Sequence, residues 1–513
     1  MARPIVWSIA GSDSGAGAGL QADLKAFEAL DLHGCTAVAA ITAQNSVSIE
    51  RVEAVSTHLL DAQLAALASD MAPLAVKTGL LGSVENVRCV ARWIDRLRRD
   101  RPLALVVDPV WRASTGATFA SQEMRQVMLR ELLPRATAIT PNRQEAGWLL
   151  GQDLGPGSGS AAIESAAKAL RALGTQAVVI TGGDSGSTRS TDYLDSTGAR
   201  GWISLPRVDT VHHHGSGCVF AASMAGALAL DFCVADAAII AKMSTTHALR
   251  CGSGAGRGSG PVRPQRGFAL HREWLPSLNR SPVAIDQSFA PLEDRRLGLY
   301  AVVDSFAWVE RVLAAGVRSV QLRIKSGTSE HVSREVLQSV KAAQAAKAQL
   351  FINDHWQLAI EHGAYGVHLG QEDLTAADLD GLQRAGLRIG LSTHSYWEVC
   401  RARALRPSYI ACGPIYPTTT KDMPWRPQGA ANLAYWCRVL SDPVVAIAGM
   451  DKQRSREAIR CGAAGVAVLR GITQALDPEL AMRELKAAIC EASRDKSIAS
   501  PDLPRSTLST FSL

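Results

Sequence analysis

The chain has 513 residues, which is more than one hydrophobic core usually supports, so we expect two domains. Its 47% hydrophobic and 20% charged residues are typical of a soluble α/β protein and exclude a disordered or fibrous chain. The net charge of +6 is not gathered into a long run of Lys or Arg, which argues against nucleic acid as a partner.

The sequence gives no sign of a membrane span or an export signal. No segment reaches the roughly 18 consecutive apolar residues that a span needs, and residues 1–15 reach Gly and Asp before a signal-peptide core could form. The ten cysteines contain no C-x-x-C pair, which argues against a disulfide framework and a zinc ribbon. We therefore expect a cytoplasmic protein without a membrane partner.

The first half alternates short β-branched runs with helical stretches. The runs are residues 4–10, 36–42, 74–79, 104–110, 136–140 and 176–181. This alternation is typical of parallel strands joined by crossover helices. We predict a doubly wound α/β sheet in a domain that covers residues 1–265.

Polar or glycine-containing stretches follow each of these six strands. They are GSDSGAGAG, TAQN, KTG, DPV, TPNRQE and TGGD, in chain order. In open parallel sheets the carboxyl ends of the strands form the ligand site. The pattern therefore predicts a ligand site at this edge, although GSDSGAGAG alone would be read equally well as a structural turn.

The stretch HHHGSGC, residues 212–218, precedes a long apolar helix. A Gly-Ser-Gly loop at a helix start presents free backbone N–H groups, and this favours an anion such as phosphate. A thiol in the first helical turn has its pKa lowered, so we expect Cys218 to serve as a base or hydrogen-bond partner. A buried structural Cys is the alternative. Adjacent histidines in extended chain point apart and do not readily share a zinc ion, so we expect His214 to order the loop.

Five stretches in this half resemble hydroxymethylpyrimidine and phosphomethylpyrimidine kinase, a family of the ribokinase-like superfamily. They are residues 10–27, 76–81, 108–110, 140–146 and 214–218, and the resemblance covers about residues 3–264. It implies that Cys218 is catalytic and that Gly215, Ser216 and Gly217 form an anion hole, with Ser216 where Thr is usual. It further implies a pyrimidine site at Asp23 and Gln44, and a site for magnesium and ATP at Lys77, Asp108, Asn142 and Glu145.

A stretch rich in Gly, Pro and Arg marks the boundary between the two halves. We predict a linker over residues 266–295, because it shows no sustained apolar period. Eight further strand-like runs then follow, each with a helix-like stretch, as a (β/α)₈ TIM barrel over residues 296–490 requires. The polar, proline-broken tail, residues 491–513, is expected to be mobile.

Polar side chains again follow the strands of the predicted barrel, where barrel active sites lie. Arg323 and Lys325 are two residues apart, so on a strand they point the same way, as a diphosphate clamp requires. A surface charge pair is the alternative. Asp354 and Asp373 end neighbouring strands and would converge as oxygen ligands of Mg²⁺. A helix cap or a loop salt bridge would explain either of them taken singly.

The series QLRIK, FIND, HLGQEDL, GLSTH and GPIYPTTTK resembles thiamine phosphate synthase over about residues 296–488. The resemblance implies magnesium at Asp354 and Asp373, and thiazole phosphate at Thr418, Thr420 and Gly449. Two departures, Ala448 where Gly is usual and Arg470 where many members have Ser, lie in the thiazole phosphate pocket. The resemblance also implies a hydroxymethylpyrimidine diphosphate site at Gln321, Arg323, Lys325, Asn353, Ser392 and Lys421.

The two resemblances support each other, because the product of the first domain would be the substrate of the second. We expect a bifunctional enzyme of thiamine biosynthesis that uses ATP and Mg²⁺ and binds only small-molecule substrates. The sequence is also compatible with a homo-oligomer. One alternative is a kinase joined to a thiazole tautomerase-like barrel. The intact stretches QLRIK and PTTTK argue against it. The other is a non-catalytic sensor of pyrimidine phosphates, which should have lost Cys218 or the magnesium carboxylates.

Overall fold

The computed structural model describes residues 3–111, 121–155, 157–183, 187–282, 288–418, 424–495 and 497–508. The chain divides into two compact units, one formed by residues 1–284 with 508–513 and the other by residues 285–507. Within the described ranges, no helix is both long and apolar enough to cross a membrane.

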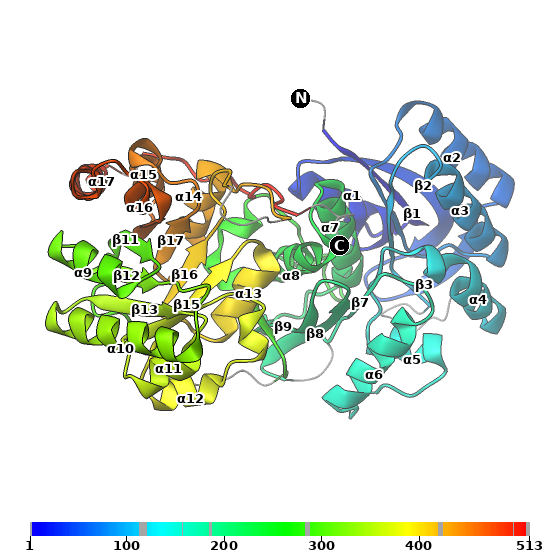
Figure 1. Ribbon diagram of the computed structural model, residues 1–513. Coiled ribbons are helices and arrows are strands. Elements are labelled where there is room, and N and C mark those ends of the chain that lie inside the picture. The colour runs from blue at the N-terminus through cyan, green and yellow to red at the C-terminus, as the bar shows by residue number, and fades with distance from the viewer. Residues whose placement is uncertain are drawn as a thin grey trace. The chain divides into compact units, whose positions relative to one another are not determined.

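The first unit is built on a ten-stranded sheet in the order β10-β9-β8-β7-β6-β5-β4-β1-β2-β3 (Figure 1). The six strands from β7 to β2 in that order are parallel and are the six predicted strands. The four antiparallel strands at the edges were not predicted. The bounds are β1 Ile5–Gly11, β2 His33–Gln44, β3 Ile49–Ala54, β4 Ala75–Thr78, β5 Ala104–Val107, β6 Ala138–Ile139, β7 Ala177–Ile180, β8 Arg189–Ser196, β9 Arg200–Pro206 and β10 Ser277–Asn279.

The helices of this unit form two groups. Helix α7 packs on α1 and α8, whereas α2 to α6 pack on one another and on the short helices η1 and η2. This arrangement confirms the doubly wound α/β fold. The bounds are α1 Gly19–Ala29, α2 Thr57–Asp70, α3 Val84–Leu97, α4 Gln122–Val127, η1 Met128–Leu132, η2 Leu133–Arg135, α5 Arg143–Leu150, α6 Ser160–Arg171, α7 Ser216–Ala229, α8 Val234–Arg250, η3 Phe268–Leu270 and η4 Arg272–Trp274.

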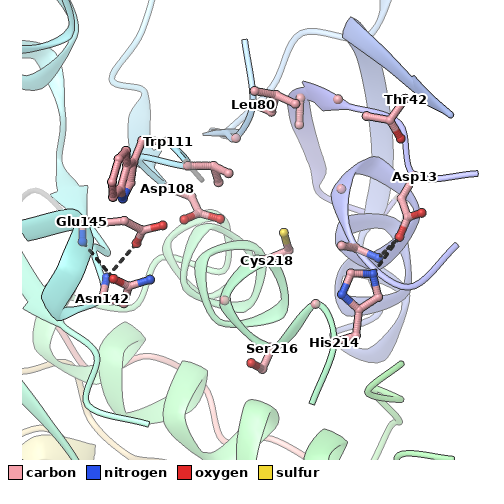
Figure 2. A pocket seen from close by; sticks show the side chains of 18 of the residues that line it. Asp13, Thr42, Leu80, Asp108, Trp111, Asn142, Glu145, His214, Ser216 and Cys218 are labelled. Atoms are coloured by element: carbon pink, nitrogen blue, oxygen red, sulfur yellow. Dashed lines mark hydrogen bonds and ion pairs between the residues drawn. The ribbon is translucent and has the colours of Figure 1, made fainter. Parts of the chain in front are cut away.

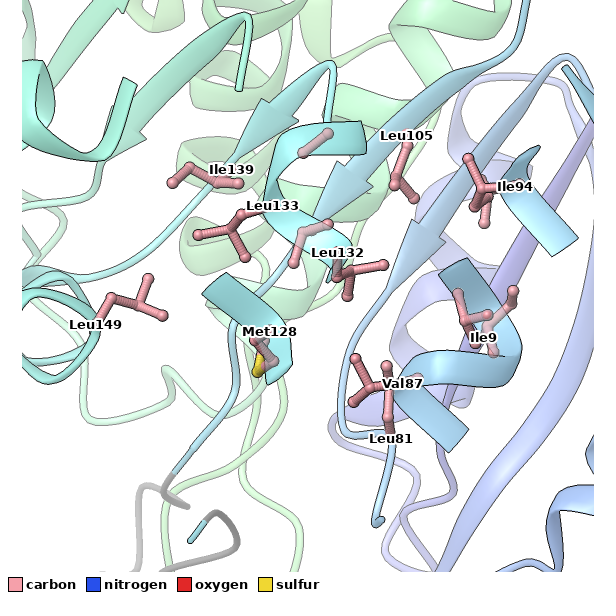
Figure 3. Packing of buried hydrophobic residues seen from close by; sticks show 14 of the residues in the cluster. Ile9, Leu81, Val87, Ile94, Leu105, Met128, Leu132, Leu133, Ile139 and Leu149 are labelled. Carbon is pink, nitrogen blue, oxygen red and sulfur yellow. The ribbon is translucent and has the colours of Figure 1, made fainter. Parts of the chain in front are cut away.

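One hydrophobic core of this unit lies between the sheet and the second helix group. Figure 3 shows Ile9 of β1 and Leu105 of β5 with Val87 and Ile94 of α3 and Leu132 of η1 in one buried cluster. Strands covered on both faces are continuously apolar, which is why these short runs could be recognised in the sequence.

The second unit is a closed barrel of eight parallel strands, which confirms the predicted (β/α)₈ fold (Figure 1). All eight predicted strands are present. The strands are β11 Gly298–Val303, β12 Ser319–Leu322, β13 Gln349–Asn353, β14 Gly366–Leu369, β15 Arg388–Thr393, β16 Tyr409–Cys412, β17 Val444–Ile447 and β18 Gly465–Val468. The helices are α9 Phe306–Ala314, α10 Ser329–Ala345, α11 Trp356–Glu361, η5 Asp373–Thr375, α12 Leu379–Arg384, α13 Tyr396–Ala404, α14 Gly429–Val439, α15 Lys452–Arg460, α16 Arg470–Thr473 and α17 Pro478–Ala492.

The expected linker and tail both contain ordered contacts. Within residues 266–295, η3, η4 and β10 belong to the first unit, and β10 pairs with β9 through Leu278 and Ile203. A three-residue strand is too short to leave an apolar period in the sequence. The end of the tail is hydrogen-bonded to the barrel, because Thr507 accepts from the Arg426 amide.

Candidate active sites

A cavity of about 590 Å³ lies at the carboxyl ends of the six parallel strands of the first unit. Every one of these strands contributes residues to its wall, from the strand end or from the turn that follows. The cavity therefore lies at the edge where the sequence predicts a ligand site. The contributing residues include Gly11, Asp13, Thr42, Gln44, Lys77, Gly79, Asp108, Thr140 and Thr181.

The start of α7 forms the floor of this cavity. Gly215 has a φ of +81°, and a Cβ at this position would lie 1.9 Å from the Gly17 carbonyl oxygen, so only glycine fits. Helix α7 then begins at Ser216, and residues 215–218 all line the cavity. The N–H groups of a first helical turn have no acceptor within the helix. The loop therefore has the geometry of the predicted anion site.

Cys218 lies in the middle of the cavity, between two groups of polar residues (Figure 2). Burial raises the pKa of its thiol to about 12, and the carboxylate of Asp108 adds to this effect, while Lys77 opposes it. The expected lowering of the Cys218 pKa is therefore wrong, because the cost of burying a thiolate exceeds the benefit of the helix start. The thiol is neutral at pH 7.

Asp23 lies behind the cavity rather than on its wall. Its carboxylate is fully buried and accepts hydrogen bonds from Ser8 Oγ at 2.5 Å and from Lys77 Nζ at 2.9 Å. Asp23, predicted to bind the pyrimidine, is not among the residues that line the cavity. Its geometry is that of a residue that holds Lys77 in place, and Lys77 itself lines the cavity.

Asp13 and His214 lie on one side of the cavity (Figure 2), and Gln44 also lines it. Asp13 accepts hydrogen bonds from the backbone of Gly15, Gly17 and Ala18. His214 Nε2 lies 3.0 Å from Asp13 Oδ2 and 3.3 Å from Gln44 Nε2. His214 therefore orders the glycine loop, as expected, and also contacts the residue predicted to bind the pyrimidine.

Asn142, Glu145 and Trp111 lie on the opposite side of Cys218 (Figure 2). Asn142 caps α5 by accepting from the Glu145 amide at 2.9 Å, and Glu145 Oε2 accepts from the Asn142 amide at 2.7 Å. This capping box holds the Glu145 carboxylate at the cavity. The Trp111 ring is stacked on that of Trp148, with centroids 5.6 Å apart.

Asp108 fits the magnesium that the sequence implies. Its Oδ2 atom is buried without a hydrogen-bond partner in the described structure, 3.8 Å from Lys77 Nζ. Burial raises the pKa of Asp108 to about 6, against the lowering effect of Lys77. A carboxylate oxygen that lacks a donor on a cavity wall suits a divalent cation, and Glu145 supplies a second carboxylate.

In the barrel, a chain of hydrogen bonds joins two predicted site residues, Gln321 and Ser392. Gln321 Nε2 donates to the Tyr300 hydroxyl at 3.4 Å, which lies 2.7 Å from the Tyr409 hydroxyl. His368 Nδ1 lies 2.7 Å from the Tyr409 hydroxyl, and its Nε2 lies 2.9 Å from Ser392 Oγ. Tyr300, Tyr409 and His368 were missed in the sequence, although His368 stands within the quoted stretch HLGQED.

The predicted magnesium carboxylates of the barrel influence each other. Burial raises the pKa of Asp373, and the negative charge of Asp354 raises it further. A divalent cation between them would relieve this repulsion, so the pair fits the metal. No cluster of three metal-ligating side chains occurs among the described residues.

The expected clamp residues follow β12, which ends at Leu322, so they are not on the strand itself. Lys325 Nζ donates to Asp354 Oδ2 at 2.6 Å. Burial lowers the pKa of His368, and the positive charge of nearby Arg323 lowers it further by a smaller amount. Lys325 therefore contacts a predicted magnesium ligand, whereas Arg323 lies near His368.

The residues predicted to bind the two substrates of the barrel are only partly described. In the diphosphate set, Asn353 ends β13 and Lys421 lies outside the described residues. In the thiazole phosphate set, Thr418 follows β16 and Thr420 lies outside the described residues. Gly449 has a φ of +69°, and a Cβ there would lie 2.8 Å from the Pro417 carbonyl oxygen. The turn after β17 therefore approaches the segment after β16 closely, as a shared pocket requires.

Comparisons with known proteins match each half separately. The phosphomethylpyrimidine kinase family model matches residues 13–263, and the thiamine monophosphate synthase model matches residues 299–472. A thiamine-phosphate synthase from Yersinia pestis is 50% identical over 196 residues, which are 38% of this chain and 91% of that protein. One from Salmonella paratyphi B is 52% identical over 193 residues, 37% of this chain and 92% of that protein.

Among solved structures, an ADP complex of Bacillus subtilis pyridoxal kinase is similar to about half of the chain. It has 32% sequence identity and a TM-score of 0.48, with 51% of this chain and 98% of that chain covered. A phosphomethylpyrimidine kinase from Clostridium difficile has 28% identity and a TM-score of 0.42, with 48% and 99% covered.

Proposed function

Because the chain belongs to the thiamine-phosphate synthase family in its second half and matches the phosphomethylpyrimidine kinase family in its first, we propose that it carries out three successive steps of thiamine biosynthesis. The first unit phosphorylates hydroxymethylpyrimidine twice with ATP. The second unit joins the resulting diphosphate to a thiazole phosphate and releases diphosphate. Two observations support the proposal: the cavity of the first unit lies at the ends of its six parallel strands, and the second unit is 50% identical to thiamine-phosphate synthases.

In the kinase half, the start of α7 receives the transferred phosphoryl group. The N–H groups of Gly217 and Cys218 offer hydrogen bonds to phosphate oxygens, whereas the Ser216 N–H donates to the His213 carbonyl. Lys77 supplies positive charge at the same wall. Gln44 and His214 orient the pyrimidine at one side, while the wall with Asn142 and Glu145 receives the nucleotide. Mg²⁺, held by Asp108 and Glu145, neutralises charge on the phosphates when it is bound.

The neutral thiol of Cys218 cannot take a proton at pH 7 before substrates bind. It therefore acts first as a hydrogen-bond donor, with Asp108 as a neighbouring acceptor. This assigns to Cys218 the positioning of the hydroxyl that is phosphorylated, while Asp108 remains the proposed magnesium ligand.

In the synthase half, the chain stabilises a leaving diphosphate and needs no covalent nucleophile. Asp354 and Asp373 hold Mg²⁺, while Arg323 and Lys325 supply charge to the leaving group. The thiazole phosphate meets Thr418, Thr420 and Gly449. The diphosphate substrate is held further by Gln321, Asn353, Ser392 and Lys421.

The two alternatives differ in what they predict. A tautomerase-like barrel is disfavoured because the 50% identical relatives are synthases. A non-catalytic sensor would bind ligands without turnover. The full chain should convert hydroxymethylpyrimidine, ATP, Mg²⁺ and thiazole phosphate into thiamine phosphate, and ligand binding without any product would support the sensor. The cytoplasmic location and the oligomeric state stay predictions.

Two variants test whether each unit carries out its own reaction independently of the other. Cys218→Ala should lower phosphoryl transfer by about 100-fold and leave the coupling of supplied diphosphate unchanged. Arg323→Ala should accumulate the diphosphate without coupling it. A mixture of the two proteins should restore the pathway after a lag, because the intermediate diffuses between them. No product from the mixture, with each half-reaction separately intact, would overturn the picture of independent sites.

A further inference from the structure

The last described residues of the chain are bound to the barrel at two points. Thr507 accepts a hydrogen bond from the Arg426 amide at 2.7 Å, and its hydroxyl donates to the His394 carbonyl at 2.7 Å. The backbone of Arg505 is held on both sides by Asn432, whose Oδ1 accepts at 2.8 Å and whose Nδ2 donates at 2.9 Å. Residues 505–507, here called the C-terminal strap, thus make four hydrogen bonds to the barrel.

The strap binds where the loop after β16 returns to the barrel. The Gln428 amide donates to the Pro414 carbonyl at 2.8 Å, and the Gly429 amide donates to Ile415 at 2.9 Å. These two bonds close the base of the loop that contains Thr418. The Arg426 amide, two residues before Gln428, donates to the Thr507 carbonyl of the strap. The strap therefore adds a third backbone hydrogen bond next to the two that close the loop.

His394 connects the strap to the catalytic face. Its carbonyl accepts from Thr507 Oγ1 and also from Gln428 Nε2 at 2.9 Å. Its ring is stacked on Trp425, with centroids 3.8 Å apart. It follows β15 directly and lies two residues after Ser392, the end of the buried hydrogen-bond chain. The strap, the loop base and the end of β15 therefore share one acceptor.

We propose that the C-terminal strap is a positioning element of the synthase site: it fixes the returning end of the loop after β16 against the end of β15. This inference rests on the synthase activity proposed above. The strap lies beyond residue 472, where the match to the synthase family model ends, as does α17 of the barrel. A phosphate ligand that contacts Thr418 gains affinity when the returning end of the loop, residues 424–429, is already held in place.

Thr507→Val tests the hydroxyl, because valine keeps the shape of the side chain and removes its donor. We expect the KM for thiazole phosphate to rise about tenfold, the effect of losing one good hydrogen bond, with kcat changed less than about twofold. Thr507→Ser keeps the hydroxyl and should restore the KM. A deletion after Asp495 should raise the KM further, whereas a deletion after Leu508 keeps the strap and should leave it unchanged.

Hydrogen exchange separates this inference from the proposed function. The amides of residues 424–429 should exchange faster in the chain that ends at Asp495, whether or not the chain makes thiamine phosphate, since the Arg426 amide loses its acceptor. Phosphorylation of hydroxymethylpyrimidine should be unchanged in Thr507→Val and in the chain that ends at Leu508. An unchanged KM and unchanged exchange after the deletion, or a loss of kinase turnover in Thr507→Val equal to its loss of synthase activity, would overturn the positioning role.

Discussion

Lys77 Nζ lies 2.9 Å from Asp23 Oδ2, and both side chains are completely shielded from solvent. The pair ties α1 to β4 directly behind the kinase cavity. Burial alone would lower the pKa of Lys77, but the negative charges of Asp23 and Asp108 raise it above its ordinary value. Lys77 therefore keeps its positive charge at the site of phosphoryl transfer.

We expect Asp23→Asn to reduce the free energy of unfolding of the kinase unit by about 3 kcal/mol or more, because it leaves a buried lysine without its partner. Urea unfolding followed by circular dichroism measures this. Arg3→Ala is a matched control, since Arg3 and Glu28 form an exposed pair whose loss costs less than about 1 kcal/mol. Equal losses of unfolding free energy in the two variants would show that the buried Lys77–Asp23 pair stabilises the protein no more than the exposed pair does.

The raised pKa of Cys218 predicts slow alkylation. Iodoacetamide reacts with the thiolate, so at pH 7.5 Cys218 should be modified much more slowly than the exposed Cys490. The rate at Cys218 should still be rising above pH 9, where an ordinary thiol is already largely ionised. Mass spectrometry of the two peptides across a pH series measures both rates, and a plateau for Cys218 near neutral pH would contradict the prediction.

His368 predicts a pH dependence of barrel stability. Burial lowers its pKa to about 4, with a smaller contribution from Arg323, against an ordinary value near 6.5. Between these values the unfolded state binds more protons than the folded state, so the free energy of unfolding should fall as the pH drops from 6.5 to 4. The loss should reach about 3 kcal/mol at pH 4.

The measurement is urea unfolding of the wild-type chain and of His368→Gln at half-unit pH steps. The variant is expected to be less stable at pH 7, but its stability should depend less steeply on pH in this window. Parallel profiles for the two proteins would show that His368 is not the titrating group.

Ala448 has a φ of +80°, in the left-handed region that a side chain disfavours. We expect Ala448→Gly to stabilise the barrel by about 0.5–1 kcal/mol, since relief of this strain exceeds the added entropy of the unfolded chain. Ala446→Gly, in β17, should instead destabilise the protein. Thermal unfolding of both variants checks the prediction, and a lower melting temperature for Ala448→Gly would refute it.

The parallel strands and their polar ends could be predicted because each leaves a short continuous apolar run in the sequence. Strand β8 could not be predicted in this way. It carries Asp192 and Asp195, which are buried only because Lys242 and Arg171 reach them from other elements. The sequence shows an aspartate but not its partner, and burial of a charge depends on the partner.

The same limit explains what the sequence does not show at the two sites. The position of Asp23 behind the cavity depends on Lys77, which is 54 residues away in the chain. The pKa of Cys218 depends on how much of the protein covers the start of α7, and a local motif does not report this. Likewise, the contact of His368 with Tyr409 joins two strands through the barrel interior, whereas a sequence pattern reports one strand at a time.

Strand β10 determines where the two halves can be separated by engineering. A kinase half that ends at residue 265 would lose this strand and leave the backbone of β9 unpaired along one edge. Open sheet edges recruit strands from other molecules, so such a fragment should aggregate. A fragment that continues through residue 282 keeps the edge covered and is the better starting point for isolating the kinase.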